Sequence, residues 1–258
     1  MLLAVDVGNS TTVLGVFSGD RLRHRWLLST ASGRTIDEHA LLVSGLLERV
    51  GLQLGADLTG VVVGSVVPTV TESLRTLFRR ELSGDAHPIV IGPGVRTGLQ
   101  IRHDHPQDLG ADRIANAVAV AALYGGPAVV VDLGTAISVD AIDASGAFVG
   151  GAIAPGILTG ADALAARAAR LPTVEPVAPD SPIGRSTTTA LQSGIINGAA
   201  GLVDGLVSRI SLELGQGVTT VATGGTAELV LDRCATIDHH DPALTLKGLR
   251  LVWERNAR

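Results

Sequence analysis

The chain has 258 residues, a hydrophobic content of 46%, a charged content of 17% and a formal net charge of −5. This composition supplies apolar material for a large buried core, and nucleic-acid binding is disfavoured because there is no basic block and aromatic residues make up only 2%. The single cysteine, Cys234, excludes an intrachain disulfide and fits a reducing cytosol. The N-terminus lacks the pattern of a signal peptide, so we expect a cytoplasmic protein.

The first part of the chain predicts a meander of strands followed by a helix. Residues 2–28 contain three short strand-like runs, with a turn at Ser18-Gly19-Asp20 between the second and the third. Thr35 and Glu38 have the spacing of a capping box, which predicts a helix that begins near Thr35.

Two further strands and a second helix are expected before residue 92. Residues 60–67 form an apolar run typical of a fully buried strand, and residues 88–91 predict another strand. Between them, Thr69 and Glu72 have the spacing of a second capping box, which predicts a helix that ends near Leu82.

The longest uncharged run extends from Ile114 to Val131 and reaches the length of a membrane span. Asn116 and the Gly125-Gly126-Pro127 break interrupt it. We therefore interpret it as a buried helix followed by a buried strand, and we expect no contact with a membrane.

The second half of the chain repeats the layout of the first. Asp6 lies 13 residues before the turn glycine Gly19, and Asp132 lies 14 residues before the turn glycine Gly146. Each aspartate ends an apolar strand and opens a hairpin. This repeat predicts a duplicated α/β fold with mixed sheets, divided into residues 1–114 and 115–258. The remaining expected elements are helices at roughly 158–170 and 187–214, a strand over 218–225 and a helix from about Pro242.

The sequence excludes the commonest phosphate-binding motifs. A P-loop requires a lysine after a glycine, but the only lysine is Lys247, which follows a leucine. The strand lysine of protein kinases is absent for the same reason. Gly92-Pro93-Gly94 does not follow the βα turn that a dinucleotide fingerprint needs.

The repeated Asp-x-Gly hairpins offer another way to bind phosphate. A carboxylate at a strand end can hold Mg²⁺ through its water shell, and a glycine turn lets backbone N–H groups approach phosphate oxygens. Two such hairpins facing each other would hold a triphosphate from both sides, and the glycines of residues 222–226 would lie against an adenosine. A single Asp-x-Gly turn is usually structural. The pair, together with Thr-Gly-Gly in this order, favours a nucleotide site.

This order of motifs resembles the acetate and sugar kinase/Hsp70/actin superfamily and, within it, the type III pantothenate kinase family. The resemblance covers almost the whole chain, and GADR and GGAIAPG are its most specific motifs. The matching stretches are DVGNST (6–11), GPGVRTGL (92–99), LGADRIANA (109–117), VVVDLGTA (129–136), GGAIAPG (150–156), IGRST (183–187), QSGIINGAAGLVDG (192–205), ATGG (222–225) and LTLKGLRLVWERN (244–256).

The resemblance implies a fold and an activity. The fold is α/β, with duplicated ribonuclease H-like (actin-like ATPase) domains, mixed sheets flanked by helices and ATP in the cleft between the domains. Residues 1–114 would carry the first phosphate loop, and residues 115–258 the second phosphate loop and the adenosine loop. The activity is ATP-dependent phosphorylation of pantothenate to 4'-phosphopantothenate, the first step of coenzyme A biosynthesis. Members are homodimers with substrate bound near the subunit interface.

The resemblance also implies roles for individual residues. Asp112 would be the general base, Asp6 would be associated with Mg²⁺ through water, and Asp132 would hold a monovalent cation, K⁺ or NH₄⁺. The implied nucleotide-binding residues are Asp6, Val7, Gly8, Asn9, Ser10, Thr11, Thr12, Val13, Thr135, Gly224 and Gly225. The implied pantothenate-binding residues are His103, Gly110, Ala111, Asp112, Arg113 and Thr187.

The sequence departs from the family at three places. Ile137 and Ser138 replace two threonines, His39 replaces a tyrosine of the first-domain helix, and His103 stands where a tyrosine usually contacts pantothenate. Two alternatives therefore stay open: a catalytically silent nucleotide-binding homologue with a regulatory role, and a kinase of another small hydroxy acid. Taken without the family, Asp112 and Arg113 are a charge pair at a helix N-terminus. The His103/His105 and His239/His240 pairs are expected to be surface residues rather than metal ligands.

Overall fold

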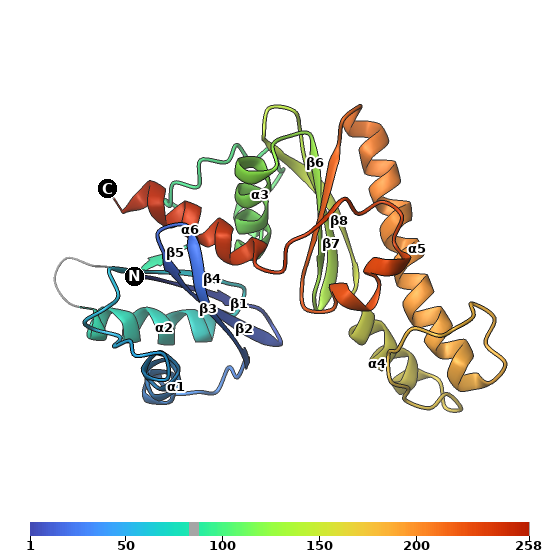
Figure 1. Cartoon of the computed structure of the whole chain (residues 1–258), viewed down its shortest axis with the longest axis horizontal. Coiled ribbons are helices and arrows are strands. Elements are labelled where there is room, and N and C mark those ends of the chain that lie inside the picture. Colours follow the sequence, from blue (N-terminus) through green and yellow to red (C-terminus); the bar gives the residue numbers. More distant parts are fainter. Residues whose placement is uncertain (83–87, 258) are drawn as a thin grey trace. The chain divides into compact units, whose positions relative to one another are not determined.

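The computed structural model describes residues 1–82 and 88–257 (Figure 1). The chain forms two compact units. Unit 1 comprises residues 1–99, 105–119 and 244–258, and unit 2 comprises residues 100–104 and 120–243.

Unit 1 contains a mixed five-stranded sheet in the order β3-β2-β1-β4-β5. The first three strands form the predicted antiparallel meander, and β4 and β5 continue the sheet in parallel to β1. Hydrophobic side chains on one face of this sheet pack with helices α1 and α2 into one core. The strands are β1 (Leu2–Val7), β2 (Thr11–Ser18), β3 (Arg21–Ser29), β4 (Gly60–Ser65) and β5 (Ile89–Val90), and the helices are α1 (Ile36–Glu48) and α2 (Pro68–Glu81).

The opposite face of this sheet is covered by helix α6 (Leu244–Asn256), which lies against β1 and β4. Close packing depends on glycine, because a Cβ at Gly60 would overlap the indole of Trp253. Helix α3 (Ala111–Leu123) crosses α6 in direct contact, since a Cβ at Gly248 would overlap the carbonyl oxygen of Ala115. The first nine residues of α3 therefore share unit 1 with α6.

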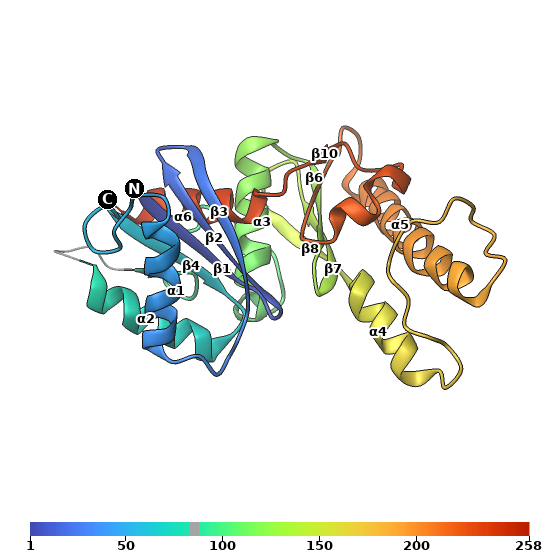
Figure 2. The ribbon, with the colours of Figure 1, turned by 60° about the horizontal axis from the view of Figure 1, so that its bottom comes forward.

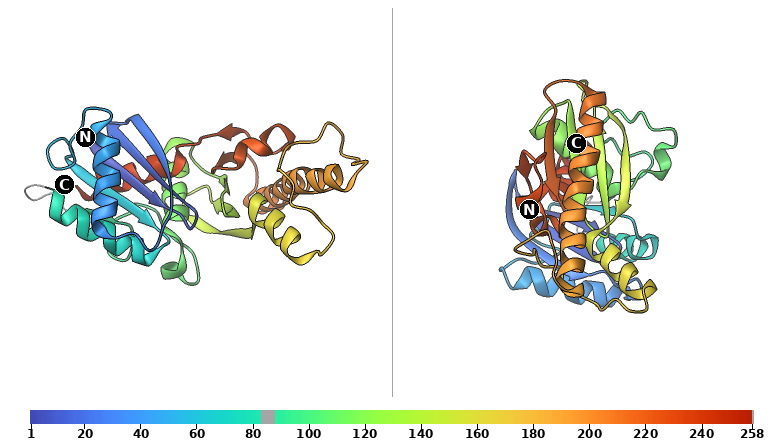
Figure 3. Two further views of the ribbon diagram at one scale, coloured as in Figure 1. Left: turned by 90° about the horizontal axis from the view of Figure 1, so that it is seen from below. Right: turned by 90° about the vertical axis from the view of Figure 1, so that its right-hand side faces the viewer.

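Unit 2 contains a second mixed sheet in the order β10-β9-β6-β7-β8. Its core lies between the sheet and helix α5 (Thr187–Leu214), which runs along the strands in Figure 3. Helix α4 (Ile157–Arg167) packs beside α5 (Figure 2). The strands are β6 (Ala128–Leu133), β7 (Ala136–Ile142), β8 (Phe148–Pro155), β9 (Thr219–Thr223) and β10 (His239–His240).

The two sheets confirm the predicted duplication. In each, three antiparallel strands form a meander, and the first strand of the meander also pairs in parallel with a later strand: β4 in unit 1 and β9 in unit 2. The two Asp-x-Gly turns therefore occupy equivalent positions, between the first two strands of each meander. The uncharged run from Ile114 is divided between α3 and β6, as expected.

The compact units differ from the predicted division at residue 114. The chain passes from unit 1 to unit 2 inside α3, between Ala119 and Val120, and α6 returns to unit 1. Both differences have one cause, since α3 and α6 pack against each other. Residues 100–104 also join unit 2, because Ile101 pairs with Phe148 at the edge of the second sheet.

The second predicted capping box is wrong. Helix α2 begins at Pro68, one residue before Thr69, and its N-cap is Val67, which makes no side-chain capping bond. Proline is favoured in the first helical turn because that turn leaves N–H groups without helical partners. Glu72 instead pairs with Arg75 one turn along the helix, with 2.6 Å between nitrogen and oxygen. The first capping box is confirmed, because Thr35 and Glu38 make both reciprocal bonds.

Helix α5 has the length and hydropathy of a membrane span, judged by composition alone. This is weak evidence, because one apolar helix in the core of a water-soluble protein passes the same test. Only 22% of its apolar window is buried inside the structure. The exposed residues of this helix in the single chain include Gly194, Gly198 and Leu212.

Candidate active site

The first Asp-x-Gly hairpin is a tight turn between β1 and β2. The Gly8 N–H donates to the Thr11 carbonyl at 3.0 Å, which closes the turn immediately after Val7. The Val7 carbonyl in turn accepts a hydrogen bond from the Val66 N–H at 3.0 Å, so the segment after β4 lies beside the turn. Asp6, at the end of β1, is partly buried.

The direction of the Asp6 side chain follows from strand alternation. Val5 and Val7 belong to the core shared with α1 and α2, so Asp6 points to the opposite face of the sheet. Its register partner on β4 is Gly64. A Cβ at Gly64 would lie 3.7 Å from the Cβ of Ala111, so the first turn of α3 lies on the same face as Asp6.

The predicted substrate segment, Gly110–Arg113, forms the start of α3. The Asp112 side chain folds back over Gly110, where an added Cβ would overlap its Oδ1. The same Oδ1 accepts a hydrogen bond from the Arg113 N–H at 2.8 Å. A carboxylate in this first turn is favoured by the positive end of the helix dipole. The Cγ1 of Val66 would lie 3.5 Å from a Cβ at Gly110.

These contacts place two predicted groups together within unit 1. The Asp6 turn and the Gly110–Arg113 segment meet at the carboxyl ends of β1 and β4, and Val66 lies beside both. Asp112 and Arg113 are partly buried there. Unit 1 can therefore offer turn amides, a strand-end carboxylate, a second carboxylate and a guanidinium at one edge of its sheet.

The second hairpin connects β6 and β7 in unit 2. The Gly134 N–H donates to the Ala136 carbonyl at 3.0 Å, so this turn is one residue shorter than the first. The Leu133 carbonyl accepts hydrogen bonds from the Thr226 N–H at 3.0 Å and from the Thr226 hydroxyl at 2.9 Å. Thr135 is exposed, and Asp132 is partly buried.

The predicted adenosine loop lies directly against this second hairpin. Gly224 has a φ of +101°, and a Cβ there would lie 2.5 Å from the backbone of Leu133, so only glycine fits. Gly225 has no heavy atom within 4 Å of its Cβ position. Of the two glycines, Gly224 therefore positions the loop on the hairpin, and Gly225 faces open space where a ligand can approach.

Sequence reasoning assigned no role to three residues that fasten the turns. The Thr135 carbonyl accepts hydrogen bonds from the Gly156 N–H at 3.1 Å and from the Thr159 hydroxyl at 2.7 Å. Thr30, which follows β3, bonds to the first turn. Gly156 belongs to the GGAIAPG motif, and that motif was the available signal for it. Thr30 and Thr159 carry no local signal, because their partners lie 22 and 24 residues away.

A second buried carboxylate lies on the same face of the sheet as Asp132. Asp132 is the register partner of Ser138, and Asp140 lies two residues further along β7. The Ser138 hydroxyl donates to Asp140 at 3.5 Å, and Asp140 is only 1% exposed. Ser138, one of the departures from the family, therefore contributes a hydroxyl between these two carboxylates.

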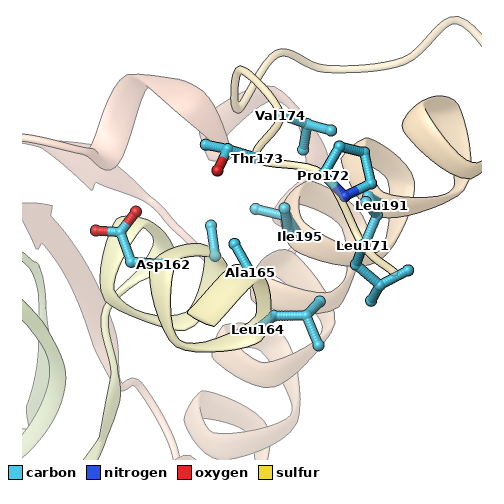
Figure 4. A pocket seen from close by; sticks show the side chains of 10 residues that line it. Asp162, Leu164, Ala165, Leu171, Pro172, Thr173, Val174, Leu191 and Ile195 are labelled. Carbon is cyan, nitrogen blue, oxygen red and sulfur yellow. The ribbon is translucent and has the colours of Figure 1, made fainter. Parts of the chain in front are cut away.

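The remaining predicted substrate residues lie in unit 2. The His103 ring packs on Phe148, with ring centroids 6.3 Å apart. Thr187 is the first residue of α5 and lies at a groove of about 590 Å³ between α4 and α5, which Pro155 and Gly156 also line. Figure 4 shows the neighbouring pocket, in which Leu164, Leu171 and Ile195 come together. His103 and Thr187 are thus in a different unit from Gly110–Arg113.

A metal ion at this site would be bound by single carboxylates rather than by a cluster of protein ligands. Among the residues that the structure describes, no group of three or more His, Cys, Asp or Glu side chains could hold a metal ion. Mg²⁺ in phosphoryl-transfer sites keeps several waters and uses one or two carboxylates together with substrate phosphates. Asp6, at the strand end beside the first turn, fits that mode of binding.

The two sheets and their hairpins define an actin-like ATPase or sugar-kinase fold. Two solved structures share this fold. A Baf family transcriptional activator from Campylobacter jejuni is 21% identical, with a TM-score of 0.62, over 99% of this chain and 98% of that one. The activator of 2-hydroxyisocaproyl-CoA dehydratase from Clostridium difficile, with bound ADPNP, is 16% identical with a TM-score of 0.56, over 99% and 96%.

Sequence comparison then gives the family. The model of type III pantothenate kinase matches residues 2–209, and the chain belongs to this family. A type III pantothenate kinase of Thermobifida fusca is 51% identical over 99% of this chain and 100% of its own length. Those of Streptomyces coelicolor and Moorella thermoacetica are each 49% identical, over 99% of this chain and 98% and 100% of their own lengths.

Proposed function

We propose that this protein transfers the γ-phosphoryl group of ATP to the primary hydroxyl of pantothenate. The product is 4'-phosphopantothenate, the first intermediate of coenzyme A biosynthesis. Family membership at about 50% identity over nearly the whole chain supports this activity. The observation that carries it is the meeting of the Asp6 turn with Gly110–Arg113 at one edge of the unit 1 sheet.

Within this proposal, the substrate segment acts on pantothenate. Asp112 is the general base that takes the proton of the attacking hydroxyl, and Gly110 and Ala111 shape the backbone around it. Arg113 binds the pantothenate carboxylate, because a guanidinium offers paired N–H donors to a carboxylate. Phosphoryl transfer depends mainly on positioning and charge stabilisation, so one oriented base is sufficient. His103 and Thr187 are further substrate contacts.

The two hairpins bind the nucleotide. Residues 6–13 and Thr135 contact the phosphates, and Gly224 and Gly225 form the adenosine loop. Asp6 would hold Mg²⁺ through its water shell, and the metal would supply charge neutralisation to the phosphates. Asp132 holds a monovalent cation, K⁺ or NH₄⁺, beside the second hairpin. We further infer a homodimer in the cytoplasm.

A coupled assay tests the activity directly. Purified protein with ATP, Mg²⁺ and pantothenate should release ADP in proportion to the pantothenate consumed. ADP release without pantothenate, or release only with another hydroxy acid, would contradict the substrate assignment. Nucleotide binding with no turnover on any hydroxy acid would support the silent homologue.

A further inference from the structure

Thr30 is fastened to the first phosphate turn by three hydrogen bonds. Its N–H donates to the Ser10 carbonyl at 2.9 Å, and its hydroxyl donates to the Gly8 carbonyl at 2.8 Å. The hydroxyl also lies 2.8 Å from the hydroxyl of Thr12. Thr30 directly follows β3, which pairs with β2 on the side away from β1. The turn between β1 and β2 is therefore held by a residue that lies outside this hairpin.

The number of available hydrogens fixes which hydroxyl is the donor in the bond between Thr12 and Thr30. A threonine hydroxyl has a single hydrogen. Since Thr30 gives its hydrogen to the Gly8 carbonyl, Thr12 must be the donor in the bond between the two hydroxyls. Thr12 is 9% exposed and Thr30 is partly buried, so the two hydroxyls are partly shielded from water. Each hydroxyl therefore has one defined orientation.

These bonds fix the orientation of two peptide planes. In a planar trans peptide, the carbonyl and the following N–H point in opposite directions. With the Gly8 carbonyl held toward Thr30, the Asn9 N–H points away from Thr30. The Ser10 carbonyl is held in the same way, so the Thr11 N–H also points away. Asn9 and Thr11 are alternate residues of the turn, and N–H groups that converge on one side of a turn form a binding surface for anions.

We propose that Thr30 is a positioning residue that orients the amides of the first hairpin toward the nucleotide phosphates. This inference rests on the proposed role of that hairpin in binding ATP. Thr30 itself contacts no phosphate and acts through the peptide groups of Gly8 and Ser10. Without its hydroxyl, the Gly8–Asn9 peptide loses the bond that fixes its direction.

The second hairpin contains a related arrangement, built from a different element and placed one residue later, at the residue after the Asp-x-Gly glycine. Thr159, in the first turn of α4, donates its hydroxyl to the Thr135 carbonyl, and the Gly156 N–H donates to the same oxygen. The Ala136 N–H therefore points away from α4. Each phosphate turn thus has a threonine outside it whose hydroxyl holds a turn carbonyl. Because a threonine hydroxyl holds a turn carbonyl in both hairpins, the Thr30 bond is more than an incidental loop contact.

The test removes the hydroxyl of Thr30 and measures nucleotide affinity separately from stability. Thr30→Val deletes the hydroxyl and keeps the branched shape, and Thr30→Ser keeps the hydroxyl. Thr59→Val is the matched control, because its hydroxyl donates to the Met1 carbonyl at the other end of β1. Calorimetry with a non-hydrolysable ATP analogue and Mg²⁺ gives Kd, thermal unfolding gives Tm, and steady-state assays give kcat and KM.

We expect Thr30→Val to weaken binding of the analogue by about tenfold, an effect of the size of a lost hydrogen bond to a charged group. KM for ATP should rise with Kd, while KM for pantothenate stays unchanged. Thr30→Ser should restore affinity to within about twofold of wild type. Thr59→Val should lower Tm as much as Thr30→Val does and leave Kd unchanged. Thr30→Ala repeats the deletion if valine disturbs the fold.

Asp6→Asn separates this inference from the role of the hairpin. If Asp6→Asn weakens binding of the Mg²⁺ complex and Thr30→Val does not, the positioning role is wrong and the hairpin assignment stands. If neither substitution changes Kd, the hairpin is not the phosphate site and both proposals fail. A Kd that changes only in proportion to Tm, in Thr59→Val as in Thr30→Val, would reduce Thr30 to a structural residue.

Discussion

Asp112 is the residue on which the proposed chemistry depends most. Its carboxylate lies in the first turn of α3, folded over Gly110 and bonded to the Arg113 N–H. Asp112→Asn keeps the shape and removes the base, so kcat should fall by about 10²–10⁴. Affinity for an ATP analogue should stay nearly unchanged, because the proposed phosphate contacts lie elsewhere. Steady-state kinetics and calorimetry measure the two effects together.

The control for this substitution is Asp57→Asn. Asp57 accepts a hydrogen bond from the Gln53 N–H at 2.8 Å in a loop before β4, away from the carboxyl end of the sheet. It should keep wild-type kcat. If Asp112→Asn retains more than about a tenth of wild-type kcat, the general-base assignment fails. Asp112 would then be a helix N-terminal charge beside Arg113.

Asp132 leads to a prediction about salts. It is partly buried at the end of β6, beside Ser138 and on the same face as the buried Asp140. A proposed cation site here predicts faster turnover in K⁺ or NH₄⁺ than in Na⁺ at equal ionic strength. Asp132→Asn should remove the difference between the salts. Equal wild-type rates in all three salts would contradict this role.

His39 leads to a prediction about stability in acid. Its side chain is 8% exposed, and its Nε2 is buried without a hydrogen-bond partner. Burial lowers the pKa of His39 below 6.5, and the Arg34 charge lowers it further, while Glu38 opposes this. The neutral ring is therefore favoured in the folded state. Its contribution to stability is complete above pH 6.5 and decreases as the pH falls toward the folded-state pKa.

The measurement compares wild type with His39→Phe. Urea unfolding at pH 7.5 and pH 5.5 should show a loss of stability for wild type at the lower pH, and a smaller loss for the variant. Other titrating groups contribute equally to both proteins, so the difference isolates His39. Identical pH dependence in the two proteins would show that the ring does not titrate between the folded and unfolded states in this range.

At the scale of the elements, the position of the loop after β9 depends on one glycine. Gly224 combines a φ of +101° with backbone contact to Leu133, so Gly224→Ala is strained and must displace the second hairpin. We expect a loss of about 1–3 kcal/mol in the free energy of unfolding, within the usual range for such substitutions. Gly225→Ala has open space at its Cβ and should unfold like wild type in the same denaturant titration. Equal stability of both variants would contradict the contact with Leu133.

Local sequence signals predicted the elements well, because their causes are local. The Thr35 and Glu38 capping box lies within one turn, and α5 begins and ends where the pattern placed it. The box at Thr69 failed because Pro68, just before it, already occupies the first helical position. The association of α6 with unit 1 depends on Trp253 packing over Gly60, a contact between residues far apart in the sequence. The periodicity of hydrophobic residues in the sequence cannot predict such a contact.

In the candidate site, too, the features with a local sequence motif could be predicted, and those that depend on contacts between distant segments could not. Asp6, Gly8, Asp132 and Gly134 could be proposed from the sequence because each hairpin carries its own motif, and their roles stay predictions. Thr30 and Thr159 were missed, since their significance arises only when distant segments fold against the turns. Which unit holds each predicted substrate residue also required the structure, because the chain passes between the units within α3.

At the scale of the whole molecule, an open surface lies along α5, beside its groove with α4. Gly194, Gly198 and Gly201 have no heavy atom within 4 Å of their Cβ positions, and the groove beside α4 is lined mostly by apolar side chains. Leu164 is 41% exposed there. An apolar surface of this kind on a single chain usually marks an interaction site. Small residues also let two helices approach closely, which fits the homodimer that we propose.

Light scattering tests this assembly. At micromolar concentration the wild type should have a mass of twice 26.3 kDa, consistent with a C₂ dimer. Gly198→Glu places a charge on the open face of α5 and should shift the equilibrium to monomer, because an unpaired charge is costly to bury. Gly45→Glu is the matched control, a helical glycine of α1 that also has open space at its Cβ, and it should stay dimeric. A wild-type mass near 26.3 kDa would contradict the dimer, and a dimeric Gly198→Glu would place its interface elsewhere.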